Sequence, residues 1–218
     1  FSVRLIDGKK VALKIGDSEG FQGDHNETSI NEIDGRLQFS PHFLDYLWIH
    51  KALGELGHAP KILGLIPPKQ MKAYAKVERI WIGEGQTPIG ILMEEIPEGW
   101  NFTKSKRIEP RTHADEASWI PVKFTTWTVE DVKRVAQRIR IIGVALDGLG
   151  VRGHDPQFLI SLKDKSVHLI DLDLFTVQNP SIHSNEYLKT IRELIRLWET
   201  ATGKERTFPV EVKAELLK

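Results

Sequence analysis

The sequence predicts an α+β fold with two lobes, an antiparallel sheet with one helix over residues 1–98 and a reduced, mainly helical lobe over residues 99–218. Short strand-like runs, separated by glycine and proline, fill the first part. Two long segments with helical periodicity dominate the second part. A chain of 218 residues is long enough for one compact domain or for two small lobes that share a cleft.

The composition is that of an ordinary globular protein. Hydrophobic residues make up 40% of the chain and charged residues 28%, which argues against disorder and against a coiled coil. Lys and Arg total 30, as do Asp and Glu, so no global positive field would attract nucleic acid or an anionic membrane. Because the chain has no cysteine, a disulfide framework, a thiolate nucleophile and a cysteine-ligated zinc are all excluded.

We expect a cytoplasmic protein without a membrane partner. No run approaches the roughly 18 uninterrupted apolar residues of a membrane span, and no signal peptide is visible. The absence of cysteine also fits the cytosol. The sequence decides neither the oligomeric state nor what precedes Phe1.

The first elements are predicted from turn and capping signals. Residues 1–15 are expected to form two strands around a turn at Asp7-Gly8, with Lys14 in the second strand. Residues 17–38 are polar and rich in glycine, which predicts a long loop with at most a helical turn. A helix over 40–56 follows, with Ser40 as N-cap, a proline at its first position and a glycine just past its end.

Three further strand-like runs complete the predicted sheet. They cover residues 61–66, 73–82 and 88–96, and they are separated by two prolines at 67–68 and by the glycines of 83–86. Residues 100–127 show no clear periodicity and are interpreted as an irregular insertion.

The second lobe contains two helices and a hairpin. Thr128 is expected to cap a helix that runs to about residue 148, with Asp131 completing a variant of the capping box. A short hairpin is predicted between residues 158–161 and 167–171, and a final amphipathic helix over 185–200. Trp48 and Trp198 have helical core spacing, so we expect both to pack in the interior.

The order of these elements, together with two motifs, resembles the protein-kinase-like superfamily from Lys14 to about Phe175. Val11-Ala-Leu-Lys14 is similar to the strand that carries the phosphate-binding lysine of kinases. Leu169-Ile-Asp171-Leu-Asp173 is similar to the segment that carries the metal-binding aspartate. The resemblance implies ATP and Mg²⁺ as cofactors, with Lys14 on the phosphates and Asp171 and Asp173 on the metal.

The catalytic loop has three possible alignments. An ungapped alignment back from Asp171 puts Gly153 in the position of the catalytic base and Phe158 in that of the metal-binding Asn. Alignment on the apolar strand gives Arg152 and Gln157 instead. A shortened loop would keep His154 and Asp155 as the catalytic element, with Asp155 as base and Gln157 as a neutral metal ligand, and this alignment is slightly favoured. The other interpretation is that Asp155-Pro156 is only a turn.

Other positions depart from the kinase pattern or extend it. No glycine-rich loop precedes Lys14, and the helix that should offer it a glutamate has Asp45 and Glu55, of which Asp45 is the better placed partner. Glu95 and Trp100 lie where the resemblance implies the hinge between the lobes, so both are candidates for contacting the nucleotide. Only one clear helix follows Phe175, which argues against a protein substrate.

Three functions are compatible with this sequence. The first is an atypical phosphotransferase that uses Mg-ATP and a small-molecule substrate. The second is a pseudokinase that binds partners without turnover. The third is a kinase-like fold that transfers another group, such as an aminoacyl group from aminoacyl-tRNA. In that case the basic stretches 104–111 or 133–140 would contact the tRNA, although a solvated charged face is the more frequent explanation of such stretches.

Overall fold

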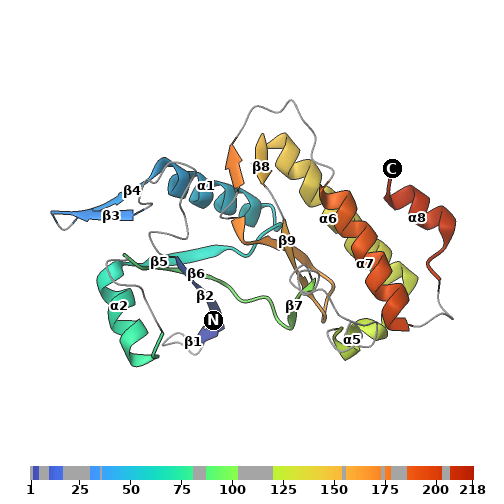
Figure 1. The fold of residues 1–218 in the computed structure, drawn as a ribbon, viewed down its shortest axis with the longest axis horizontal. Helices are drawn as coiled ribbons and strands as arrows, with labels where there is room; N and C mark the ends of the chain where they lie inside the picture. The colour runs from blue at the N-terminus through green and yellow to red at the C-terminus, as the bar shows by residue number, and fades with distance from the viewer. Residues whose placement is uncertain are drawn as a thin grey trace, which may run out of the picture. The chain divides into compact units, whose positions relative to one another are not determined.

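The computed structural model describes residues 2–4, 10–16, 30–34, 36–80, 87–102, 120–153, 156–172, 175–177, 186–202 and 207–218. It confirms an α+β protein with small antiparallel sheets and helices (Figure 1). The contacts divide the chain into two compact units. The first comprises Phe1–Glu95 with Leu172–Thr176, and the second comprises Ile96–Asp171 with Val177–Lys218. No helix among the described residues has the length and apolar character needed to cross a membrane.

A four-stranded antiparallel sheet is the framework of the first unit. Its strand order is β1-β2-β6-β5, and every neighbouring pair is antiparallel. The two strands of the predicted opening hairpin are paired, and Lys14 lies in the second of them, directly opposite Ile91 of β6. The strands span Ser2–Arg4 (β1), Lys10–Gly16 (β2), Ile62–Ile66 (β5) and Ile89–Glu94 (β6).

A second hairpin replaces part of the loop predicted over residues 17–38. Strands β3 (Ile30–Ile33) and β4 (Arg36–Phe39) pair antiparallel, with Ile30 opposite Phe39. Asp34 has a positive φ of 51° at their connection, where an Asp-Gly dipeptide supplies a strong hairpin signal. The loop prediction was therefore wrong at its C-terminal end, and its residues 17–29 lie outside the described part of the chain.

Helix α1 (Pro41–Glu55) begins and ends as its sequence predicts. The Ser40 hydroxyl accepts a 3.1 Å hydrogen bond from the backbone N–H of Phe43, and Gly57 beyond the end has a φ of +71°. Contrary to the prediction, Trp48 does not pack in the interior. Its side chain is 48% exposed, because the buried face of α1 is formed by Phe43, Tyr46, Ile49, His50 and Leu53.

Helix α2 (Pro68–Val77) occupies the first half of a segment that was predicted to be a strand over 73–82. Pro67 is its N-cap residue and Pro68 its first residue, a position where the missing N–H costs nothing. Met71 and Ala75, one turn apart, are buried and form a cluster with Leu13 of β2. The strand prediction was wrong because the buried residues Met71 and Ala75 recur at helical spacing. Residues 81 and 82 of the predicted strand lie outside the described ranges.

The second unit contains a three-stranded antiparallel sheet with the order β10-β9-β7. Strands β9 (Gln157–Ser161) and β10 (Val167–Ile170) confirm the predicted hairpin. Strand β7 (Gly99–Asn101) and helix α5 (Val122–Thr125) lie in the stretch interpreted as an irregular insertion, which is a partial correction. The described residues also include β8 (Val151–Gly153) and β11 (Phe175–Val177).

Three longer helices complete the described part of the second unit: α6 (Val129–Gly148), α7 (Glu186–Thr202) and α8 (Val210–Leu216). Helix α6 contacts both α7 and α8. The predicted capping box is present, since Thr128 Oγ1 accepts from the Asp131 backbone N–H and Asp131 accepts from the Thr128 backbone N–H. Helix α8 corrects the expectation of a single helix after Phe175.

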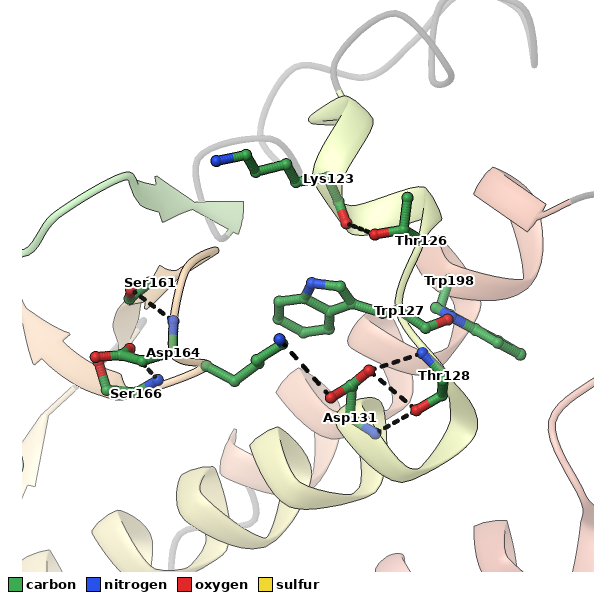
Figure 2. Close-up of polar contacts among 10 residues, drawn as sticks. Lys123, Thr126, Trp127, Thr128, Asp131, Ser161, Asp164, Ser166 and Trp198 are labelled. Carbon is green, nitrogen blue, oxygen red and sulfur yellow. Dashed lines mark hydrogen bonds and ion pairs between the residues drawn. The ribbon is translucent and has the colours of Figure 1, made fainter.

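Figure 2 shows the polar contacts that join the start of α6 to its surroundings in the second unit. The buried indole of Trp198 in α7 donates a 2.9 Å hydrogen bond to the backbone carbonyl of Trp127, which confirms that Trp198 packs in the interior. Asp131 also lies 3.9 Å from Lys165, in the turn between β9 and β10. These contacts fix the beginning of α6 against α7 and the hairpin.

Candidate functional site

A chain of three polar side chains connects all three strands of the second-unit sheet. The side-chain amide of Asn101, at the end of β7, donates a 3.3 Å hydrogen bond to Oε1 of Gln157. Nε2 of Gln157, the first residue of β9, donates a 2.6 Å hydrogen bond to Oδ2 of Asp171. Two of the residues predicted to bind metal, Gln157 and Asp171, are thus in direct contact.

Local backbone structure explains how Gln157 and Asp171 meet. Gln157 lies opposite Ile170, the last residue of β10, so Asp171 leaves the sheet beside it. Asp171 has a left-handed φ of +60°, a region that Asp and Asn tolerate better than most residues with a Cβ. This turn of the backbone ends the strand at the residue whose carboxylate receives the glutamine amide.

Gln157, in the middle of this polar chain, and Asp171, at its end, differ in burial. Gln157 is only 4% exposed, and both its amide oxygen and its amide nitrogen have a partner, as a buried carboxamide requires. Asp171 is exposed to solvent. Gln157 is therefore held by a partner on each side, and the carboxylate that it contacts belongs to an exposed residue.

Asn101 is a residue of this polar chain that sequence analysis missed. It was placed in an irregular insertion, yet it belongs to β7 and lies opposite Leu159 of β9. A three-residue strand carries too little alternation to be recognised from its own residues. Only the pairing of β7 with a strand more than fifty residues away brings Asn101 to Gln157.

In the first unit, Lys14 lies against helix α1. Its Nζ is 5.4 Å from the centre of the Tyr46 ring. Asp45, the predicted partner of Lys14, precedes Tyr46 in α1 and is half-buried. A Lys14–Asp45 pair stays a prediction, while the contact with the neighbouring tyrosine is an interaction that the sequence analysis missed.

His50 contacts both the Tyr46 hydroxyl and the backbone at Pro60. Its Nε2 lies 2.7 Å from the carbonyl oxygen of Pro60 and its Nδ1 lies 3.2 Å from the Tyr46 hydroxyl. Burial lowers the pKa of His50 to about 4; the Pro60 carbonyl opposes this change and the positive charge of Lys14 adds to it. His50 is therefore neutral at physiological pH.

The two hinge candidates have different surroundings. Trp100, in β7, is 8% exposed and packs against Phe102 and Phe124 with ring centres 5.7 and 4.7 Å away. Its indole Nε1 is buried and has no hydrogen-bond partner among the described residues. Glu95 is half-buried at the end of the first unit, after β6. Trp100 thus belongs to an aromatic cluster, and a nucleotide contact by either residue stays a prediction.

The remaining predicted residues fall outside the described ranges: His154, Asp155 and Asp173. Within those ranges, no group of three or more His, Asp or Glu residues could hold a metal ion. Mg²⁺, however, is typically bound through one or two carboxylates together with water and substrate phosphates. The exposed carboxylate of Asp171 fits that pattern, whereas Gln157 presents its N–H rather than its oxygen toward Asp171.

Comparison with known proteins adds no family assignment. No model of a known protein family matches the chain, and no curated protein matches it significantly. The case for a function therefore depends on the residues and contacts described above.

Proposed function

We propose that this protein is an atypical kinase-like phosphotransferase that uses Mg-ATP to phosphorylate a small molecule. The observation that carries the proposal is the hydrogen bond between Gln157 and Asp171. It joins the residue in the position of the metal-binding aspartate to the residue that replaces the catalytic-loop Asn in two of the three alignments. Such a pair is expected if the segment 150–173 descends from a kinase catalytic loop.

Burial supports the alignment on Gln157 over the ungapped one. Phe158, which the ungapped alignment would place at the Asn position, is 1% exposed and lies opposite Leu169 in the hairpin. Packing in the sheet alone explains why Phe158 is a buried phenylalanine. Gln157 is the neighbour that reaches the carboxylate, so it is the better candidate for the polar position.

The element order also supports the proposal. Lys14 lies in a strand of an antiparallel sheet, followed by the β3–β4 hairpin, helix α1, strands β5 and β6 with α2 between them, and later α6 and the β9–β10 hairpin. In a phosphotransferase Lys14 would bind phosphate oxygens, Asp171 would hold Mg²⁺, and Asp155 would orient the acceptor hydroxyl and accept its proton. Mg²⁺ would neutralise charge on the transferred phosphoryl group.

Calorimetric titration with ATP and Mg²⁺ tests the proposal. Asp171→Asn removes the negative charge but tolerates the left-handed backbone, which makes it a sharper variant than alanine. Asp164→Asn is the matched control, because Asp164 lies in the turn at the other end of the same hairpin and accepts a hydrogen bond from Ser166. We expect Asp171→Asn to weaken Mg-ATP binding at least tenfold and Asp164→Asn to leave it intact. No binding by the unmodified chain, or equal binding by both variants, would contradict the proposal.

A second candidate is a pseudokinase that binds partners without turnover. The orientation of Gln157 favours it, because Gln157 donates an N–H to Oδ2 of Asp171 and does not offer its oxygen to a metal ion at that carboxylate. This candidate predicts that ATP binding, if present, does not depend on Mg²⁺. The same titration repeated with EDTA in place of Mg²⁺ therefore separates the two functions.

A further inference from the structure

We propose that the exposed side of helix α2 binds the phosphate backbone of duplex nucleic acid through a lysine row formed by Lys69, Lys72 and Lys76. This binding surface is additional to the phosphotransferase function and does not depend on it. The row belongs to the first unit alone, since all three side chains come from one helix of that unit.

The three lysines share one side of α2. They follow each other at intervals of three and four residues, a spacing that aligns side chains along a helix, and all three residues are exposed. The opposite side of α2 packs on the sheet, where Met71 and Ala75 are buried in a cluster with Leu13 (Figure 1). The lysine row therefore lies on the exposed side of a helix whose apolar side is already covered.

The positive charge of the lysine row is not balanced locally. Helix α2 contains no Asp or Glu, and among the described residues no carboxylate forms an ion pair with any of the three lysines. Glu78 and Arg79, which follow the helix, add no net charge. Because the whole chain has a formal net charge of zero, the row is a local positive region and not part of a generally basic protein.

This charge pattern is unfavourable for the helix itself. Like charges three or four residues apart repel each other, and Lys69 lies in the first turn, at the positive end of the helix dipole. Only Lys76, in the last turn, is favourably placed for the dipole. Helix α6, in contrast, has two acidic residues in its first turn. An exposed helix side that departs in this way from the stabilising pattern is expected where its charges serve in binding.

The phosphates of a nucleic-acid duplex match the lysine row in charge and in length. Lys69 and Lys76 are seven residues apart, which at about 1.5 Å per residue corresponds to about 10 Å along the helix. A duplex has one phosphate about every 3.4 Å of its axis on each strand, so the row spans about three phosphates of a strand. Lysine presents a point charge and not a planar fork, which suits contact with phosphates irrespective of the base sequence.

An anionic membrane matches this surface less well. Amphipathic helices bind membranes by burying their apolar side in the interface, and in α2 that side packs against the sheet. The only large hydrophobic residue of α2 that is exposed is Val77, within the part of the chain that the structure describes. Binding by α2 therefore depends on charge, which a regular series of phosphates supplies.

Fluorescence anisotropy with a short labelled DNA duplex of random sequence, measured at several salt concentrations, tests the proposal. Each phosphate contact changes the slope of log association constant against log salt by about −0.9, so the lysine row should contribute about −2.7. The triple variant Lys69→Gln/Lys72→Gln/Lys76→Gln should lose this contribution and bind at least about tenfold more weakly at low ionic strength. Each single substitution should reduce the slope by about 0.9.

A second triple variant, Lys51→Gln/Lys163→Gln/Lys218→Gln, is the matched control. It removes the same charge from three exposed positions outside α2, so it should keep the affinity and the salt slope of the unmodified chain. Glutamine is about as good a helix former as lysine, and the α2 substitutions remove a repulsion. Thermal unfolding should therefore show the α2 variant to be at least as stable as the unmodified chain. If the triple variant does not fold, the three single substitutions provide the same test.

Two results would overturn the proposal. The first is a duplex affinity that is absent in the unmodified chain, or that is equal in the α2 variant and in the control variant. The second is binding to phosphatidylserine vesicles that the α2 variant loses, without any binding to the duplex. That outcome would assign the lysine row to a membrane surface instead.

Discussion

Nε2 of Gln157 donates a 2.6 Å hydrogen bond to Oδ2 of Asp171, while Oε1 of Gln157 accepts one from Asn101. The orientation of the glutamine amide is therefore set from both sides. If Gln157 is to offer its oxygen to a cation beside Asp171, its amide must rotate, and the amide of Asn101 must rotate with it. We therefore expect Asn101 to favour the orientation in which the Gln157 N–H faces Asp171.

Removing Asn101 should destabilise the second unit. Asn101→Ala leaves the buried oxygen of Gln157 without its donor, which we expect to lower the free energy of unfolding by about 1–3 kcal/mol. Urea denaturation measures this change. In Gln157→Leu the unpaired oxygen is absent, so adding Asn101→Ala to that variant should cost much less. Equal costs in both backgrounds would show that the two amides are not coupled.

The pKa of His50 predicts loss of stability in mild acid. In the unfolded chain His50 titrates at 6.5, and in the folded protein burial lowers its pKa to about 4. Between these values the unfolded chain binds a proton that the folded protein does not, so stability is full above pH 6.5 and falls as the pH drops toward 4. The effect amounts to about 3 kcal/mol at most.

Urea denaturation across pH 4 to 8 measures this contribution against His50→Gln. Glutamine does not titrate, and its amide N–H is able to donate to the Pro60 carbonyl. Subtracting the two profiles removes the contribution of groups such as Asp131 and Asp164, which keep their environments in both proteins. Parallel profiles would mean that His50 is able to take up a proton in the folded state.

Most elements with strong local signals were predictable from sequence, although the β3–β4 hairpin was missed despite its Asp-Gly turn, and elements that depend on distant pairing were not. Ser40 and Thr128 cap α1 and α6 because their hydroxyls satisfy backbone N–H groups three residues ahead. In α2, by contrast, Ala73, Ala75 and Val77 alternate as in a strand. The segment is helical because the helix packs Met71 and Ala75 against Leu13.

The candidate site shows the same division. Gln157 and Asp171 were predicted as metal ligands from the resemblance of their segments to kinase motifs, and the register of the β9–β10 hairpin brings them together. Asn101 was missed, because it reaches Gln157 only through pairing of β7 with β9. The contact of Tyr46 with Lys14 was not predicted, because it depends on the packing of α1, which periodicity does not specify.

The capping box at α6 should contribute measurably to stability. Thr128→Ala removes the hydroxyl that accepts from the Asp131 backbone, and we expect a loss of about 1 kcal/mol in the free energy of unfolding. Thr126→Ala is the control, since the Thr126 hydroxyl donates to the Lys123 carbonyl on the exposed surface just before α6 (Figure 2). Thermal unfolding compares the two. A control that loses as much stability as Thr128→Ala would rule out a special role for the cap.

The same cap predicts an effect of pH. Burial raises the pKa of Asp131, but hydrogen bonds from the Thr128 backbone and hydroxyl and the charges of Lys165 and Arg134 outweigh it, so the net pKa is lowered. A carboxyl group with a lowered pKa stabilises the protein above its ordinary pKa near 3.8, and the contribution is lost as pH falls below it. Thr128→Ala should therefore have a shallower loss of stability below about pH 4 than the unmodified chain, which acid titration followed by circular dichroism would measure.

Two glycines in α6 offer a matched pair for testing the contact between α6 and α7. A Cβ at Gly143 would lie 2.7 Å from the ring of Tyr187, whereas a Cβ at Gly148 would meet nothing within 4 Å. Alanine favours a helix over glycine by up to about 1 kcal/mol, so Gly148→Ala should leave stability unchanged or raise it slightly. Gly143→Ala should lower it by about 1–3 kcal/mol, because the ring must move from a packed position. Tyr187→Ala combined with Gly143→Ala removes the clash, so in that background the substitution at Gly143 should no longer cost stability. A Gly143→Ala protein as stable as Gly148→Ala would show that α7 shifts freely against α6.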